Sequence, residues 1–242
     1  MSTEWEFKSY TKKYHRSKYP AIDPSKPSNS AAGKVVIITG GGSGLGPHIA
    51  QAFITAGARA IGIIGRRAKV LEETKKELEA FGKAQIVTAA ADVTDVDGLN
   101  KAVTSIKEQT GPINVFVANA GYLAKAAKLT ETDIGDWWSG FEINVLGTLA
   151  QFRAFAANKA EKDAAFVSVN TLAAHAGPFP TMSGYAISKL ATLELVAYAA
   201  AEYPEVRVVS FHPGVLETDM GTKAGLPLSR DDSKFRVSNL TR

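Results

Sequence analysis

A tyrosine and a lysine stand four residues apart in the run Tyr-Ala-Ile-Ser-Lys, as Tyr185 and Lys189. In a helix, residues i and i+4 share one face, so the Lys189 ammonium group would lie beside the Tyr185 phenol. A neighbouring cation favours the phenolate, and we therefore expect the pKa of Tyr185 to fall below its usual value of about 10. Such a phenol can donate or accept a proton near neutral pH. The alternative is an ordinary surface pair, worth roughly 0.2–0.5 kcal/mol.

A glycine-rich segment supplies the second functional signal. It covers residues 39–46, reads Thr-Gly-Gly-Gly-Ser-Gly-Leu-Gly, and lies between a strand pattern and a helical pattern. Glycines at this place let backbone N–H groups approach a pyrophosphate, whose charge the helix N-terminus stabilises. Glycines also form ordinary tight turns, but the position between strand and helix favours a dinucleotide site. The expected cofactor contacts here are Gly40, Ser43, Gly44, Leu45 and Gly46.

The residues after the second apolar run indicate which dinucleotide is bound. An NAD site usually has an Asp or Glu there, which accepts hydrogen bonds from the adenosine ribose. In this chain Gly65 is followed by Arg66 and Arg67, and no carboxylate stands there to repel a 2′-phosphate. Arginine pairs with phosphate through charge-assisted, often bidentate bonds, so we expect Arg66 to hold this group and NADP to be the cofactor. The alternative is two solvated arginines at the start of a helix.

Six apolar runs of strand length alternate with helical patterns. The runs are Val35–Thr39, Ala60–Gly65, Gln85–Ala89, Ile113–Ala118, Ala164–Val169 and Val206–Phe211. Near-continuous apolar composition suits strands that helices cover on both faces of a parallel sheet. The alternation predicts an α/β fold with a doubly wound parallel sheet of the Rossmann type, and ligands bind such sheets beyond the carboxyl ends of the strands.

Two of the intervening segments carry helical patterns. Within Lys69–Phe81 the core-facing residues would be Val70, Leu71, Thr74, Leu78 and Phe81, with Glu72 and Lys76 as an i,i+4 pair. Within residues 145–157 one stripe would contain Val145, Leu149, Phe152 and Ala156.

The length and composition predict one globular domain with an N-terminal extension. The chain has 242 residues, of which 45% are hydrophobic and 21% charged. We expect an arm over residues 1–32, where Pro20, Pro24 and Pro27 interrupt regular structure, and a single dinucleotide-binding domain over residues 33–242. The net charge is +4, and most of it lies in the arm. A basic surface for nucleic acid is therefore not expected on the domain.

Several classes of protein are disfavoured by what the chain lacks. It has no cysteine, which excludes disulfides, thiol nucleophiles and thiolate metal sites. The four histidines show no ligand spacing, so we expect no metal. No signal-peptide run and no stretch of about 18 apolar residues is present, and we therefore expect a soluble cytoplasmic protein without membrane contact.

These motifs together resemble the short-chain dehydrogenase/reductase family, including fungal biosynthetic members, and the likeness runs from Lys34 to about Met220. The glycine segment matches the family's Thr-Gly-x-x-x-Gly-x-Gly. Asp92-Val93 matches its adenine-contacting pair, and the Asn-Ala-Gly at residues 119–121 follows the fourth strand. Pro213-Gly214 matches the segment that embraces the nicotinamide. The further cofactor contacts that the resemblance implies are Asp92, Val93, Asn119, Gly121, Tyr185, Lys189, Pro213, Gly214, Leu216 and Thr218.

The resemblance also implies a catalytic tetrad. Tyr185 would be the general acid in carbonyl reduction, or the base in alcohol oxidation. Lys189 would lower its pKa and bind the nicotinamide ribose, and Asn144 would hold a water in the proton relay, unless it is simply a half-buried structural residue. The family's serine is replaced here, because alignment of the fifth strand puts Thr171 at that position. Ser168 is the second choice.

The C-terminal part departs further from the family pattern. After Gly214 only 28 residues remain, and we find no convincing seventh strand. Either the terminus is shortened or a partner chain covers the sheet edge, so a homo-oligomer is one of two explanations. His175, Phe179 and Met182 lie between Thr171 and Tyr185, where they either line the substrate pocket or pack against the protein.

The sequence thus predicts an NADP-dependent oxidoreductase that moves a hydride between nicotinamide and the carbonyl or secondary alcohol carbon of a small-molecule substrate. Two alternatives stay open. The short terminus and the replaced serine also fit a cofactor-binding protein with little or no redox turnover. A dehydratase or isomerase on the same fold is the other alternative, since a fold does not fix a function.

Overall fold

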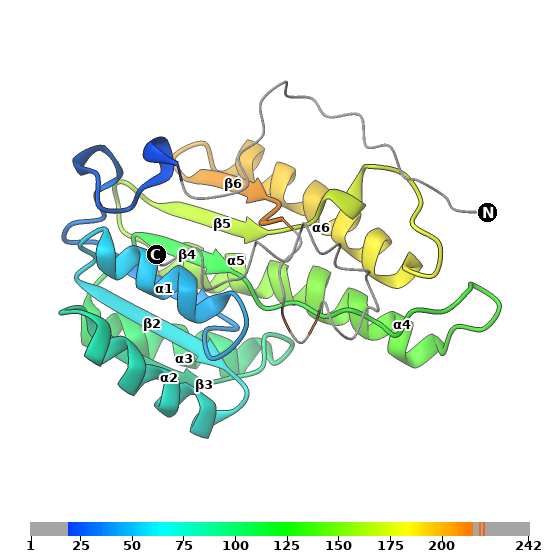
Figure 1. Cartoon of the computed structure of the whole chain (residues 1–242), viewed down its shortest axis with the longest axis horizontal. Coiled ribbons are helices and arrows are strands. Elements are labelled where there is room, and N and C mark those ends of the chain that lie inside the picture. The colour runs from blue at the N-terminus through cyan, green and yellow to red at the C-terminus, as the bar shows by residue number, and fades with distance from the viewer. Residues whose placement is uncertain (1–18, 215–217, 219, 221–242) are drawn as a thin grey trace.

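The structure, a computed structural model, describes residues 19–214, 218 and 220. Within these residues one sheet of six parallel strands has the order β3-β2-β1-β4-β5-β6 (Figure 1). The strands are β1 (Val35–Thr39), β2 (Ala60–Gly65), β3 (Gln85–Ala90), β4 (Val115–Ala118), β5 (Ala165–Val169) and β6 (Arg207–Phe211). The strand order reverses between β1 and β4, so the predicted doubly wound sheet is confirmed.

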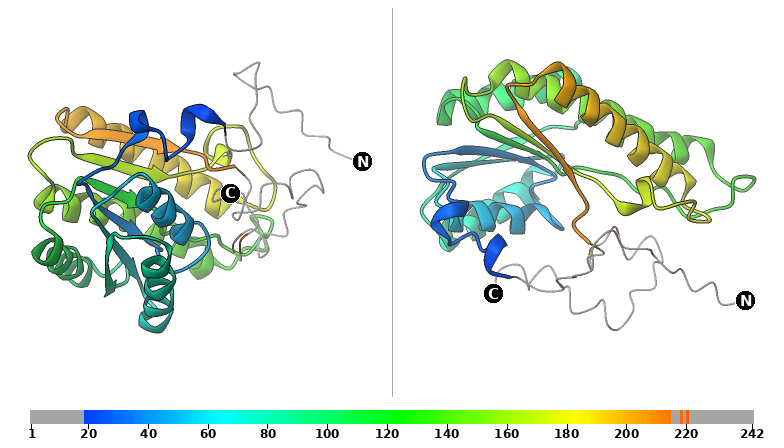
Figure 2. Two further views of the ribbon diagram at one scale, coloured as in Figure 1. Left: turned by 60° about the vertical axis from the view of Figure 1, so that its left-hand side comes forward. Right: turned by 90° about the horizontal axis from the view of Figure 1, so that it is seen from above.

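Helices cover both faces of this sheet, as the view from above shows (Figure 2, right). On one face lie α1 (Gly46–Thr55) and α2 (Ala68–Phe81). On the other lie α3 (Val96–Thr110), α5 (Gly147–Asn158) and α6 (Ser183–Glu202). Helix α4 (Ile134–Phe141) runs into α5 through a short π-helix, η3 (Glu142–Leu146). The remaining short turns are the 3-10 helices η1 (Pro20–Ile22), η2 (Pro27–Asn29) and η4 (Leu172–Ala174).

The central strand explains why the apolar runs are continuous. All five residues of β1 are buried. Successive side chains point to opposite faces, so Ile37 joins the core beneath α3 and α5, while Val36 and Ile38 join the core beneath α1 and α2. Apolar residues are therefore needed on both faces of β1. The alternation of apolar and polar residues that is typical of a half-exposed strand does not occur.

Strand β6 is the edge of the sheet within the described part of the chain. Its residues alternate between exposed and half-buried, and Val209 and Phe211 are 40% and 38% exposed. The prediction of no seventh strand concerns the 28 residues after Gly214, and of these only residues 218 and 220 are among the described residues. The expectation of a shortened sheet therefore stays a prediction.

The stripe predicted for residues 145–157 is wrong in part. Phe152 is buried and Ala156 packs against the core, but Leu149 is 41% exposed. The inward face of α5 instead includes Thr148, Gln151 and Phe155. Two of these side chains are polar, so the apolar pattern alone did not reveal this face.

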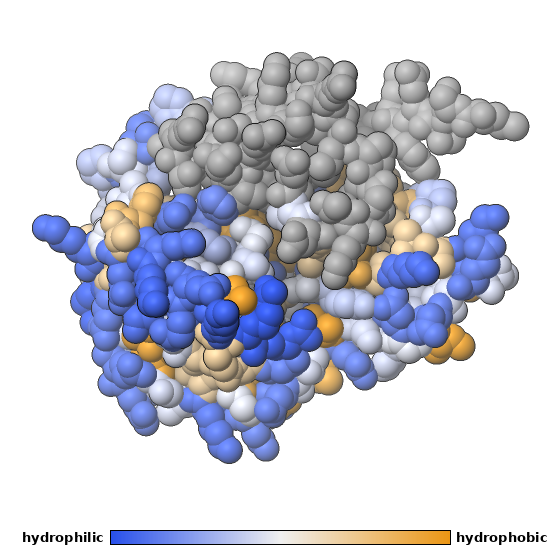
Figure 3. Space-filling view, turned by 60° about the horizontal axis from the view of Figure 1, so that its bottom comes forward, coloured by the Kyte–Doolittle hydropathy of each residue, from blue (hydrophilic) through white to orange (hydrophobic). Residues whose placement is uncertain are grey.

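Helix α2 follows its predicted pattern except at its end. Leu71, Thr74 and Leu78 are buried, whereas the terminal Phe81 is exposed. Glu72 does not pair with Lys76, because its carboxylate accepts a hydrogen bond from Thr88 of β3. The i,i+4 ion pair of α2 is formed one turn away, between Lys75 and Glu79. Hydrophilic residues predominate on the side of the molecule where α2 lies (Figure 3).

The described part of the N-terminal arm is irregular, as the prolines predicted. The Asn29 side chain holds its two 3-10 turns together by donating to the carbonyls of Ala21 (2.8 Å) and Asp23 (2.9 Å). The arm joins the domain where Ala31 N donates to Ala56 O at 2.7 Å, just after α1. Residues 1–18 lie outside the described residues. The division at residue 32 remains a prediction.

Candidate active site

The glycine segment forms a tight turn between β1 and α1. Gly40 and Gly44 adopt φ angles of +62° and +58°, in the left-handed region that favours glycine. A Cβ at Gly46 would lie 2.3 Å from the carbonyl oxygen of Gly40, so only glycine lets the helix start this close to the strand. Pro47 occupies the first turn of α1, where its missing N–H has no helical partner to lose. The turn thus presents the backbone cradle that a pyrophosphate requires.

Asn119, predicted to contact the cofactor, braces this turn from the end of β4. Its Nδ2 donates to the carbonyls of Thr39 (2.9 Å) and Gly40 (3.3 Å). The Thr39 hydroxyl accepts from the backbone N–H groups of Asn119 and Ala120, both at 3.1 Å, and donates to Gln151 Oε1 of α5 at 2.6 Å. Gln151 is a supporting residue that the sequence did not reveal, because its link to Thr39 spans most of the domain.

Charged residues gather where β2 and β3 end. Arg66 forms an exposed ion pair with Asp92, in which the nearest N and O atoms are 3.7 Å apart. Arg67 reaches the glycine turn instead, where it donates to Ser43 Oγ at 3.4 Å. The structure therefore adds Arg67 to the arginine predicted from the sequence.

The Asp92-Val93 pair is held by its own neighbours. The Asp92 carboxylate accepts from the backbone N–H and the hydroxyl of Thr94, at 3.0 and 2.8 Å. The Val93 side chain packs so closely under α5 that a Cβ at Gly147 would lie 2.9 Å from it. Contact of this pair with an adenine ring stays a prediction.

Asn144 lies in the π-helix and is fully buried. Its side chain accepts from Tyr122 N (2.8 Å) and donates to Tyr122 O and Ser188 Oγ, both at 2.9 Å. Its backbone carbonyl accepts from the hydroxyls of Thr148 and Thr192, at 2.6 and 2.9 Å. Asn144 thus clamps the segment after β4 to α6, and its role in holding a relay water remains untested.

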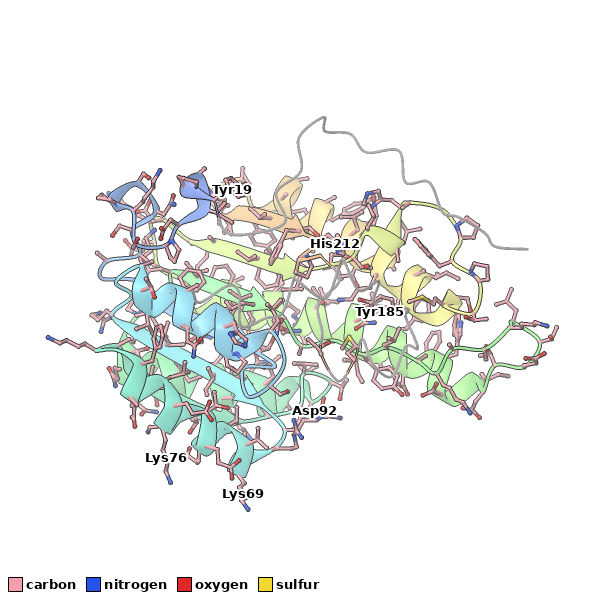
Figure 4. All side chains as sticks on the ribbon, viewed as in Figure 1. Tyr19, Lys69, Lys76, Asp92, Tyr185 and His212 are labelled. Atoms are coloured by element: carbon pink, nitrogen blue, oxygen red, sulfur yellow. The ribbon has the colours of Figure 1, made fainter. Side chains whose placement is uncertain are left out.

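Tyr185 lies in the first turn of α6 (Figure 4). Its side chain hydrogen-bonds with Thr171, just after β5. Ser168, the second choice for the tetrad, is buried inside the sheet between Ala118 of β4 and Ser210 of β6. The structure therefore brings together Tyr185 and Thr171, the residue preferred from the sequence.

The expected fall in the pKa of Tyr185 is wrong for this structure. Burial raises the pKa of Tyr185 above its usual value, and the hydrogen bond with Thr171 only partly opposes the increase. The sequence argument considered the charge of Lys189 but not the loss of water around the phenol.

Lys189 is buried next to the site. Its Nζ donates to the carbonyl of Val169 at 2.9 Å, and no carboxylate of the described residues forms an ion pair with it. Burial lowers the pKa of Lys189 from 10.5 to about 8. A Cβ at Gly121 would lie 3.5 Å from this Nζ and 3.4 Å from Asn144 Oδ1, so Gly121 stands between the two side chains. An ammonium group has three protons, and Lys189 uses one of them for this hydrogen bond within the described residues.

The buried lysine leads to a prediction about stability and pH. Its folded pKa of about 8 lies below its unfolded value of 10.5, so between these pH values the unfolded chain binds more protons. The free energy of unfolding should therefore increase as the pH rises through this window. The part of the increase that comes from Lys189 is at most about 3 kcal/mol. Urea unfolding of the wild type and Lys189→Met at pH 7.5 to 9.5 measures it. The advantage of the methionine variant should shrink as pH rises; parallel profiles would contradict the prediction.

The segment after β6 contains further residues that were predicted to contact the cofactor. Gly214 has a φ of +88°, and a Cβ there would meet nothing within 4 Å. Thr218 lies against the glycine turn, 3.8 Å from where a Cβ of Gly44 would stand. Leu216 lies outside the described residues.

Two histidines lie close together near Pro213. Burial lowers the pKa of His212, and the charge of His175 lowers it further. His175 is exposed, and contact of His175, Phe179 or Met182 with substrate stays a prediction.

The described part of the chain has neither a membrane-spanning helix nor a cluster of metal ligands. No helix there is long and apolar enough to cross a membrane. No three His, Cys, Asp or Glu side chains there come together in a way that could hold a metal ion.

The glycine turn and the Tyr-Lys pair lie beyond the carboxyl ends of the strands of a doubly wound sheet, which is where nucleotide-binding α/β proteins hold their ligands. The family model for short chain dehydrogenases matches residues 34–227. The chain therefore belongs to the short-chain dehydrogenase/reductase family, whose members are oxidoreductases that bind a nicotinamide cofactor.

Fungal relatives support this assignment. The chain is 36% identical over 225 residues to the short chain dehydrogenase pigC of Monascus ruber, a match that covers 89% of this chain and 73% of that protein. It is 35% identical over 224 residues to the short chain dehydrogenase tazN of Aspergillus terreus, covering 90% of this chain and 48% of that protein. The chain thus spans 73% of the length of the first relative and 48% of the length of the second.

Solved structures show the same fold. A short-chain type dehydrogenase/reductase from Mycobacterium ulcerans superposes with a TM-score of 0.77 at 29% identity, covering 84% of this chain and 74% of that one. Carveol dehydrogenase from Mycobacterium avium, solved in complex with NAD, gives a TM-score of 0.73 at 27% identity and covers 78% of this chain and 73% of its own.

Proposed function

We propose that this protein is an NADP-dependent oxidoreductase that transfers a hydride between nicotinamide and the carbonyl or secondary alcohol carbon of a small molecule. The observation that carries the proposal is the placement of Tyr185. It hydrogen-bonds with Thr171, lies one helical turn from the buried Lys189, and stands beyond the carboxyl ends of the strands, where the glycine turn also lies. A phenol, a hydroxyl and a cation in that arrangement suit proton transfer to a reacting oxygen.

The residues present fit a dinucleotide. The glycine turn is so tight that a Cβ at Gly46 would collide with the backbone of Gly40, and Lys189 keeps two N–H donors that can hold ribose hydroxyls. When bound, the nicotinamide supplies the hydride chemistry, and the protein supplies orientation and a proton source.

The chain's own residues would handle the proton. In reduction the Tyr185 hydroxyl donates its proton to the substrate oxygen, and in oxidation the phenolate takes a proton from the alcohol. Thr171 can donate a hydrogen bond to the same oxygen, since a threonine hydroxyl has the donor and acceptor capacity of serine. The pKa of Tyr185 is raised in the structure. Lys189 would have to lower it while the site is working, because an ammonium group favours the phenolate.

The preference for NADP is proposed to rest on both arginines after β2. Arg66 and Arg67 flank the site, and their partners, Asp92 and Ser43, lie at the ends of β3 and β1. A 2′-phosphate placed between these strand ends could take charge-assisted hydrogen bonds from either guanidinium group.

Arg66→Ala and Arg67→Ala should each weaken NADPH binding while leaving NADH binding almost unchanged. A hydrogen bond to a charged group contributes about 1.5–3 kcal/mol, which corresponds to roughly tenfold or more in Kd. Fluorescence titration with both cofactors measures the effect. Lys76→Ala is the control, since Lys76 extends from α2 away from the labelled site residues Asp92 and Tyr185 (Figure 4). If the wild type binds NADH more tightly than NADPH, the proposed role of the arginines is wrong.

The reaction itself is tested by following NADPH oxidation at 340 nm across a panel of ketones, aldehydes and quinones. Turnover of a carbonyl supports the proposal. Tight NADPH binding without oxidation across the panel would instead favour a cofactor-binding protein.

A further inference from the structure

The helix that carries Tyr185 begins without a cap of its own. Its N-cap residue is Met182, which makes no side-chain hydrogen bond to the helix. The residue before it, Thr181, has a φ of +71°, which is strained for a residue with a branched side chain. The first turn of α6, which contains Tyr185, therefore depends on other elements for its position.

Helix α4 provides this support through Trp137. A Cβ at Gly184 would lie 2.8 Å from Cδ1 of Trp137, so the indole ring rests directly on the backbone next to Tyr185. The same ring donates from Nε1 to Ser183 Oγ at 3.1 Å. A Cβ at Gly140 would lie 3.3 Å from the Gly184 carbonyl oxygen, so the two helices approach closely here as well.

The other end of this support is fixed to the segment after β4. Asp136, the residue before Trp137, accepts hydrogen bonds from the Tyr122 hydroxyl and from Lys125 N, the latter at 2.7 Å. The backbone of Tyr122 is bound in turn by the Asn144 side chain. Helix α4 therefore connects the loop beside Gly121 to the start of α6.

We propose that Trp137 is a positioning residue for Tyr185: its indole ring, acting through Gly184 and Ser183, determines where the phenol stands relative to the reacting atoms. This inference rests on the proposed function, in which Tyr185 transfers the proton. The neighbouring Trp138 offers a matched control. It is 53% exposed, and its ring stacks on Phe141 with a centroid distance of 5.3 Å.

The first test is a size-compensation cycle. Trp137→Leu should lower kcat about tenfold or more at an unchanged Kd for NADPH, because displacement of a reacting group by about 1 Å can cost up to a hundredfold in rate. Gly184→Ala should do the same, since its methyl group collides with the ring. In the double variant the methyl group enters the space that the ring left, so the two losses should not multiply. Trp138→Leu should stay within about twofold of the wild type.

Trp137→Phe separates positioning from simple loss of packing. It keeps a ring over Gly184 but removes the donor to Ser183, and we expect it to recover most of the kcat that leucine loses. Assays are made well below the melting temperature of every variant. Equal kcat for Trp137→Leu and wild type, or losses that multiply in the double variant, would overturn the proposal.

A second readout does not need turnover. Amide hydrogen exchange of a peptide covering residues 183–189 should be faster in Trp137→Leu than in the wild type and in Trp138→Leu. Unchanged exchange there would overturn the positioning role. If the wild type reduces no carbonyl but exchange responds as expected, the proposed function fails while the support of α6 by Trp137 stands.

Discussion

Tyr185→Phe is expected to lower kcat for carbonyl reduction by about 10²–10⁴-fold, which is the range that a general acid contributes. The variant removes one hydroxyl group and keeps the ring, so the packing of the first turn of α6 is preserved. The Kd for NADPH should change by no more than about twofold. Single-turnover oxidation of bound NADPH, measured beside a binding titration, separates the two quantities.

Tyr198→Phe provides the control for this experiment. Tyr198 lies on the same helix but is 61% exposed, so removal of its hydroxyl should leave kcat unchanged. Near-normal turnover in Tyr185→Phe would show that the proton comes from another group, and the enzymatic interpretation of the Tyr-Lys pair would have to be abandoned.

Gly46→Ala should produce the second large effect, this time on cofactor binding. The added methyl group would lie 2.3 Å from the carbonyl oxygen of Gly40, and a backbone atom cannot move aside as a side chain can. Overpacking of this kind costs about 1–3 kcal/mol. If the strain opens the cradle, Kd for NADPH should rise roughly tenfold to a hundredfold.

The control for this variant is Gly135→Ala, an exposed position in α4 where a Cβ would lie 3.4 Å from Asp133 Oδ1. Thermal unfolding of both variants without cofactor shows whether the strain falls on the fold or on binding. An unchanged Kd together with unchanged stability in Gly46→Ala would contradict the geometry of the turn.

The sheet could be predicted from the sequence because its strands are buried on both faces. The runs expected for β1 and β2 match the observed strands end for end, and the other four differ by one or two residues. The pattern in α5 failed for a specific reason. An apolar residue, Leu149, lies on its exposed face and a polar one, Gln151, on its buried face, so hydrophobic spacing did not show which side is inward.

The parts of the site in which a motif fixes the backbone geometry could be predicted from the sequence. Properties that depend on burial by distant elements, such as a pKa, could not. Glycine spacing indicated the turn at residues 39–46. Counting along β5 selected Thr171, which lies beside Tyr185 in the structure, and its catalytic role stays a prediction. The direction of the Tyr185 pKa was wrong, because burial depends on elements distant in sequence. Trp137 and Gly184 are 47 residues apart and share no periodic pattern, so only the fold reveals their contact.

The π-helix between α4 and α5 also restricts how this protein can vary. In an α-helix each residue advances the chain by about 100° of rotation. Deleting the surplus residue within Glu142–Leu146 would turn one flanking helix by about that angle relative to the other. Either Trp137 would lose its contact with the start of α6 or Phe152 would leave the core. Natural variants should therefore tolerate substitutions at the exposed Glu142 and Leu146 far better than a change in the length of this segment.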